Sequence, residues 1–142
     1  MMQEKLLIFI LFLKGDELSM EKDNRNMNAI EMFFYYLDLE RDKLINIIDS
    51  CLNKVGIAID ECIAYAFAEE YDVYEEGYFG KEGLKIVIQE PVVDQEKEEI
   101  YSLKTFFCFI NNYYKENLAY YNEKDRKIIE YKLKEIKKSL FN

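Results

Sequence analysis

The sequence contains no histidine, and its 142 residues include only one proline, five glycines and three cysteines. Without histidine the chain has no Ser-His-Asp triad, no Cys-His dyad and no histidine-ligated metal site. Cys51, Cys62 and Cys108 are odd in number and form no CxxC pair, which argues against a disulfide scaffold and a tetrahedral zinc site. Each adjoins apolar residues, so we expect small buried hydrophobes and a reducing, cytoplasmic location.

Basic residues are also scarce: 19 lysines and arginines face 28 acids, giving a net charge of -9. Such a chain matches a nucleic-acid backbone poorly, so we expect no nucleic-acid partner. Gly77, Gly80 and Gly83 have the wrong spacing for a phosphate loop, and residues 72–83 lack two oxygen ligands of an EF-hand. We therefore expect no cofactor, no metal site, no catalytic residue and no enzymatic activity.

The longest apolar run, at residues 6–13, is too short to span a bilayer, which takes about 20 helical residues. No small-residue cleavage site follows it, so we expect neither a signal peptide nor a membrane partner. Three interpretations stay open: a buried edge strand, a weak membrane-proximal segment, or residues upstream of the true start. A polar stretch follows Met20, and our hypothesis is that the functional product begins there. Residues 1–27 are then an N-terminal extension, and residues 28–142 form one domain.

Hydrophobic periodicity predicts four helices. Apolar residues recur at three- and four-residue spacing over residues 28–54, with a charged break at residues 38–43. Asp42 is the expected cap of the second helix, and Gly56 its expected end. Ser102 is expected to cap a third helix, and a fourth begins near residue 122.

Between these helices the apolar period changes to two, which predicts strands within residues 57–67, at residues 84–88 and at residues 99–101. The order is therefore helix–helix–strands–helix–helix. We expect an α+β fold with the helices packed on one face of a small antiparallel sheet.

Negative charge is concentrated in the middle of the chain. Residues 60–99 hold thirteen acids and three bases, and no base occurs between Lys54 and Lys81. Such a block repels itself, and together with interleaved tyrosines it is typical of a surface for a basic protein partner. The alternative is a solvated acidic face. The predicted partner-binding residues are Glu69, Glu70, Tyr71, Asp72, Tyr74, Glu75 and Glu76.

From about Met32 to Leu140, the chain resembles the CdiI-type immunity proteins of bacterial contact-dependent growth inhibition (CDI), which neutralise ribonuclease toxins. The resemblance lies in the order and spacing of four segments, MFFYYLDLERDKLINIIDSCLNKVGIAID, YFGKEGLKI, EEIYSLKTFFCFINNYY and NEKDRKIIEYKLKEIKKSL. One departure is Ala68 after Phe67, where the family often has an aromatic-proline pair.

The resemblance implies stoichiometric binding of a cognate nuclease toxin in the cytoplasm. It transfers no contact residues, so the predicted partner-binding residues rest on charge alone. The alternatives are a non-catalytic adaptor or oligomeric interaction domain and an enzyme that acts through carboxylates or an acquired divalent metal.

Overall fold

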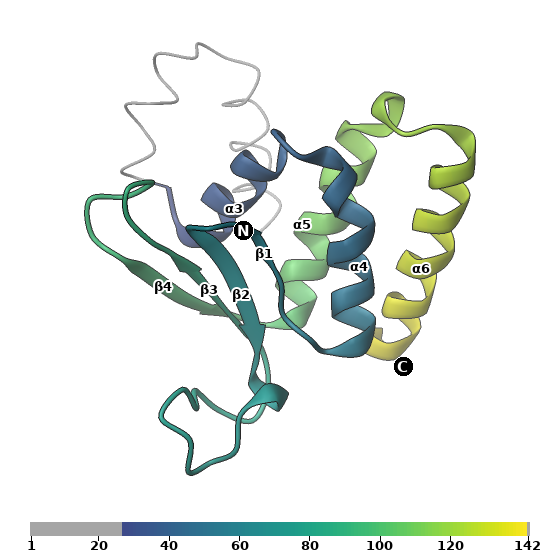
Figure 1. The fold of residues 1–142 in the computed structure, drawn as a ribbon. Coiled ribbons are helices and arrows are strands. Elements are labelled where there is room, and N and C mark those ends of the chain that lie inside the picture. Colours follow the sequence, from purple (N-terminus) through teal and green to yellow (C-terminus); the bar gives the residue numbers. More distant parts are fainter. Residues whose placement is uncertain (1–26, 142) are drawn as a thin grey trace.

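The computed structural model describes residues 27–141, which form a four-stranded sheet with four helices on one side of it (Figure 1). The apolar run at residues 6–13 and the start at Met20 lie outside the described residues, so the expectations about them, and the domain boundary after residue 27, stay predictions. The observed order of two helices, four strands and two helices confirms the predicted α+β fold.

The first two helices form where the apolar spacing predicts them. Helix α3 spans Ala29–Leu37 and begins with a capping box. In this box the Asn28 side chain accepts a hydrogen bond from the Glu31 backbone N–H, and the Glu31 carboxylate accepts one from that of Asn28, both 3.0 Å long. Helix α4 spans Leu44–Asn53 and follows a short 3-10 helix, η2, at Arg41–Lys43. The predicted break between the two helices is therefore confirmed.

Two residues expected at the ends of α4 have other roles. Asp42 lies inside η2 and does not cap α4; its carboxylate accepts a hydrogen bond from the Tyr120 hydroxyl at 3.0 Å. The residue that closes α4 is Lys54, whose φ of 56° lies in the left-handed region. Gly56 is needed for close approach instead, because a Cβ there would lie 2.0 Å from the carbonyl oxygen of Tyr65.

The sheet is an antiparallel meander in which each strand pairs with the next along the chain. Its strands are β1 (Ala58–Asp60), β2 (Ile63–Phe67), β3 (Leu84–Ile88) and β4 (Lys97–Tyr101). Tyr65 of β2 lies opposite Ile86 of β3, which in turn lies opposite Glu99 of β4. The β3 strand has its predicted bounds, and β4 begins two residues earlier than predicted.

Alternation along β2 and β3 puts one set of side chains under the helices and the other on the open side of the sheet. The buried set is Ile63, Tyr65, Phe67, Leu84, Ile86 and Ile88. Helix α3 packs on β3 and β4, and α5 (Leu103–Glu116) packs on α3. Helix α6 (Glu123–Phe141) packs on α4 and α5. Helices on one face of a small antiparallel sheet are the predicted arrangement.

Side chains of β4 hold the first turn of α3. The Glu99 carboxylate accepts from the backbone N–H of Ala29, and the Tyr101 hydroxyl accepts from that of Ile30 at 3.1 Å. The Lys97 ammonium donates to the carbonyl oxygen of Met27 at 2.7 Å. The first two bonds satisfy backbone N–H groups that a helix start leaves without partners, and all three join the beginning of α3 to the sheet edge.

The core between the layers is aromatic. The Phe106 ring of α5 lies 5.0 Å from the ring of Tyr65, 5.6 Å from Phe34 and 5.7 Å from Phe33, measured between centroids. All four rings are buried. Aromatic pairs at such distances add about 0.5–1.5 kcal/mol each to the gain from burial, so this cluster joins α3, α5 and β2.

Replacing Phe106 by alanine should therefore lower the free energy of unfolding by about 3–5 kcal/mol, since it leaves a cavity among three rings. Urea denaturation measures the loss. The control is Phe141→Ala on α6, where the ring is 52% exposed and the loss should be below about 1 kcal/mol. Equal losses in the two variants would contradict the central position of Phe106.

Candidate functional site

The seven predicted partner-binding residues lie together in the connection between β2 and β3. This connection begins with a short 3-10 helix, η3 (Ala68–Glu70), and projects beyond the end of the sheet, at the bottom of Figure 1. We call residues 69–77 the acidic loop. The carboxylates that the sequence groups in a run are therefore also grouped in space.

The neck of this connection is closed by contacts that do not involve its outermost residues. The backbone N–H of Ala68 donates to the carbonyl oxygen of Gly83 at 2.9 Å. Gly83 has a φ of 101°, and a Cβ there would lie 2.8 Å from the carbonyl oxygen of Tyr101. Glycine is thus required where the connection returns to the sheet.

Glu70 anchors the acidic loop to the rest of the fold. Its Oε1 accepts hydrogen bonds from the backbone N–H groups of Phe67 and Gly56, each at 2.8 Å. Tyr71 also acts within the connection: its ring lies 5.9 Å from that of Phe79 and fills the space beside Gly77, where a Cβ would meet it at 2.5 Å. Both residues hold the acidic loop in shape.

A hydrogen-bonded turn forms the end of the acidic loop. The Glu75 carboxylate accepts from the backbone N–H of Asp72, and the Glu75 N–H donates to the carbonyl oxygen of Asp72, each at 2.9 Å. The turn displays Val73, which is 61% exposed, and Tyr74, which is 96% exposed. We call residues 72–76 the acidic tip. Sequence reasoning missed Val73, although the Asp-x-x-Glu spacing of a reciprocal cap was a signal for this turn.

The carboxylates of the acidic loop have no basic partner in the part of the chain that the structure describes. Its ion pairs involve other acids, namely Asp38, Glu40, Asp49, Glu98, Glu123 and Glu135. Glu69, Asp72 and Glu76 also make no side-chain hydrogen bond to residues 27–141. These three charges, with Tyr74, are free to meet another molecule.

A cleft of about 680 Å³ lies beside the neck of the connection. Glu69 and Glu82 line it together with apolar side chains that include Phe67 and Ile100. Lys54 also lines it, with its ammonium 5.8 Å from the centroid of the Phe67 ring. These residues come from four separate segments of the sequence, so no local sequence pattern predicted the cleft.

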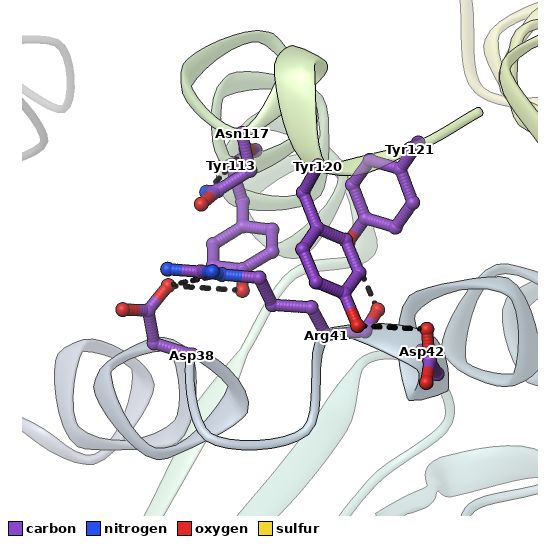
Figure 2. Close-up of polar contacts among 7 residues, drawn as sticks. All are labelled: Asp38, Arg41, Asp42, Tyr113, Asn117, Tyr120 and Tyr121. Carbon is purple, nitrogen blue, oxygen red and sulfur yellow. Dashed lines mark hydrogen bonds and ion pairs between the residues drawn. The ribbon is translucent and has the colours of Figure 1, made fainter. Parts of the chain in front are cut away.

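A second polar cluster joins the connections α3–α4 and α5–α6 (Figure 2). Asp38 Oδ1 accepts from Arg41 Nε at 3.0 Å and from the Tyr113 hydroxyl at 3.2 Å. The Tyr121 hydroxyl donates to the carbonyl oxygen of Arg41 at 2.9 Å, and the Arg41 guanidinium lies over the Tyr120 ring. Because every group has a partner, the cluster is a clamp between helix pairs, at the opposite end of the molecule from the acidic loop (Figure 1).

The tyrosines of this clamp are protonated over a wide pH range. Burial raises the pKa of Tyr113 well above its usual range, and the Asp38 charge adds to the effect. Burial likewise raises the pKa of Tyr121, and the neighbouring Tyr120 adds to it. Since both hydroxyls stay neutral at physiological pH, they serve as hydrogen-bond donors and not as bases.

The buried cysteine and the acidic side chains of residues 27–141 show neither a reactive thiolate nor a metal cluster. Burial raises the pKa of the Cys51 thiol to about 12, so this cysteine is not a thiolate at neutral pH. No group of three or more cysteine and acidic side chains in the described range could hold a metal ion. Within the same range, no helix is long and apolar enough to cross a bilayer.

The family model described as CDI immunity protein matches residues 26–132, three quarters of the chain. The chain belongs to the CDI immunity protein family. This confirms the predicted family. The matched range of this CDI immunity protein includes the sheet, the acidic loop and the clamp, and it ends within α6. No curated protein and no solved structure matches the chain.

The two bonds accepted by Glu70 predict a stability difference between neighbouring glutamates. Glu70→Ala should lower the free energy of unfolding by about 1–3 kcal/mol, because two backbone N–H groups lose a charged acceptor. Glu69→Ala, one residue away, removes no hydrogen bond and should change it by less than about 0.5 kcal/mol. Thermal and urea unfolding measure both, and a larger loss in Glu69→Ala would refute the anchoring role.

The raised pKa values of the buried tyrosines predict alkaline destabilisation. Unfolded tyrosines lose their protons near pH 10, whereas Tyr113 and Tyr121 hold theirs in the folded state. Unfolding therefore releases protons above about pH 10, and the free energy of unfolding should fall as pH rises. Denaturation series between pH 8 and 11 measure the slope, and Tyr113→Phe should make it shallower. An unchanged slope in that variant would show that Tyr113 titrates normally.

Proposed function

We propose that this CDI immunity protein binds and neutralises a cognate ribonuclease toxin by stoichiometric association, with the acidic loop as its docking surface. The observation that carries the proposal is the group of uncompensated carboxylates on one preorganised loop. A ribonuclease must bind phosphates, so its active cleft is basic. Glu69, Asp72 and Glu76 present negative charges to such a cleft, in place of an RNA backbone.

The shape of the acidic tip supports the same proposal. The turn from Asp72 to Glu75 is held by its own hydrogen bonds, so little conformational freedom is lost on docking. Tyr74 offers a large exposed ring, and tyrosine is enriched among the residues that dominate interface energies. The charges raise the rate of encounter, and the ring supplies apolar contact once the partners meet.

Inhibition by occlusion needs no catalysis. The proposal therefore includes that the protein is not an enzyme and that it acts in the cytoplasm, where its three free cysteines would stay reduced. It requires one toxin domain for each immunity protein, and its natural candidate is the C-terminal domain of a large secreted protein encoded directly upstream.

The test uses the purified C-terminal domain of that upstream protein and the variant Glu69→Lys/Asp72→Lys/Glu76→Lys. The toxin affinity should fall by about 100-fold, mainly through a slower association rate, and the remaining binding should lose most of its salt dependence. Titration calorimetry and stopped-flow fluorescence measure these quantities. The three side chains make no hydrogen bond or ion pair to the described part of the chain, so the variant should fold normally.

The matched control is Glu61→Lys/Glu90→Lys/Asp94→Lys, which changes the net charge equally at exposed positions outside the acidic loop. It should keep wild-type affinity within about threefold, because distant charges are screened at physiological salt. If both triple variants bind equally well, the toxin docks elsewhere. If the wild-type protein neither binds nor inhibits the upstream domain, that domain is not its toxin.

A further inference from the structure

A groove of about 460 Å³ runs between α5 and α6 and has a character opposite to that of the acidic tip. Phe107, Leu118 and Leu133 give it apolar walls, and Lys115, Lys134 and Lys137 stand along it. Within residues 27–141 none of these three lysines forms an ion pair. The one acid in the lining, Glu130, is already bonded by the Tyr114 hydroxyl at 2.6 Å.

The acidic tip has the complementary pattern. Its exposed Val73 and Tyr74 are apolar groups that a groove with apolar walls could cover, and Asp72 and Glu76 flank them as free carboxylates. Apolar residues flanked by acids thus match an apolar groove flanked by lysines. Both elements are held in place: the tip by its turn and the groove by the packing of two long helices.

The two elements are separate in the molecule. Figure 1 shows the acidic loop below the end of the sheet, whereas α5 and α6, which pack on each other, lie in the helical layer to the right of the sheet. Because the tip and the groove of one copy do not meet, each can bind the complementary surface of a second copy. We infer that this protein self-associates head to tail, with the acidic tip of one copy seated in the α5–α6 groove of the next.

The net charge of -9 opposes this association, but only weakly at physiological salt. Charges separated by more than about 8 Å are largely screened at that ionic strength, so the contacting groups decide the interaction. A single turn in a single groove covers less surface than the roughly 1,200 Å² of a small stable interface. The association should therefore be weak. Because the tip and the groove are different surfaces, each added copy leaves one of them open, and the assembly should grow beyond the dimer.

Self-association would cover the acidic tip. If the proposed function holds, toxin and a second copy then compete for the same residues. The toxin would release single copies from the assembly, and the assembly would keep the tyrosine and the carboxylates of the tip covered until a toxin arrives.

The test is sedimentation equilibrium of the full chain from about 10 µM to 1 mM, compared with two charge-reversed variants. For the wild type, the average mass should rise with concentration from 17.1 kDa to more than twice that value. Asp72→Lys/Glu76→Lys reverses the tip, and Lys134→Glu/Lys137→Glu reverses the groove. Each variant alone should stay at the mass of one chain, because its remaining normal surface meets a like charge.

An equimolar mixture of the two variants is the decisive sample. The intact tip of the groove variant fits the intact groove of the tip variant, and the two reversed surfaces also carry opposite charges. Mixing should therefore restore the concentration-dependent mass. The control Lys124→Glu/Lys127→Glu changes exposed lysines of α6 outside the groove and should associate like the wild type.

Tyr74→Ala should reduce self-association at least fivefold, whereas Tyr131→Ala, at another exposed tyrosine, should not. A wild type of constant mass up to 1 mM, or a mixture that fails to associate, would overturn the inference. Loss of toxin affinity in the groove variant would also overturn it, by assigning the groove to the toxin. Toxin binding is measured at low micromolar concentration, so the proposed function can stand or fall separately.

Discussion

The fold depends on the contact between the inner face of the sheet and the aromatic side chains of α3 and α5. Phe33, Phe34, Phe106 and Tyr65 meet there as one ring cluster, and the alternating residues of β2 and β3 complete it. This contact fixes the direction of β2. The strand leaves the core at Phe67, and the acidic loop begins directly afterwards, so the position of the loop follows from the packing of the core.

The polar groups at the helix ends and between the helices are joined by hydrogen bonds, and this sets the acidic loop apart. The start of α3 is held by β4, and the clamp in Figure 2 occupies the hydroxyls of Tyr113, Tyr120 and Tyr121. The carboxylates of Glu70 and Glu75 likewise accept hydrogen bonds from backbone N–H groups. Three carboxylates without a partner in the described residues, those of Glu69, Asp72 and Glu76, lie close together on this projection beside the exposed Tyr74. This is why the projection, and not the clamp, is the candidate for recognition.

Periodicity in the sequence was enough to predict the fold class, the order of elements and the bounds of β3, because burial on one face imposes a period on the side chains. The distribution of charge along the sequence also showed that acidic residues are concentrated in one segment. Residue preferences at helix ends were less reliable. The predictions that Asp42 caps α4 and that Gly56 ends it were wrong, since a polar residue or glycine near a helix end need not be the capping residue. The clamp was missed because Asp38 and Tyr113 are 75 positions apart, and no local spacing links them. For the same reason, the anchoring role of Glu70 became visible only once Gly56 lay beside it.

The closed neck of the connection between β2 and β3 has a consequence for how such a protein can diversify. The Ala68–Gly83 bond and the two bonds of Glu70 hold the connection without help from Asp72, Val73, Tyr74 or Glu76. Mutations at those four positions should therefore change the free energy of unfolding only slightly. Under the proposed function, a lineage that meets a new toxin can change the residues of the outermost turn while the scaffold stays the same.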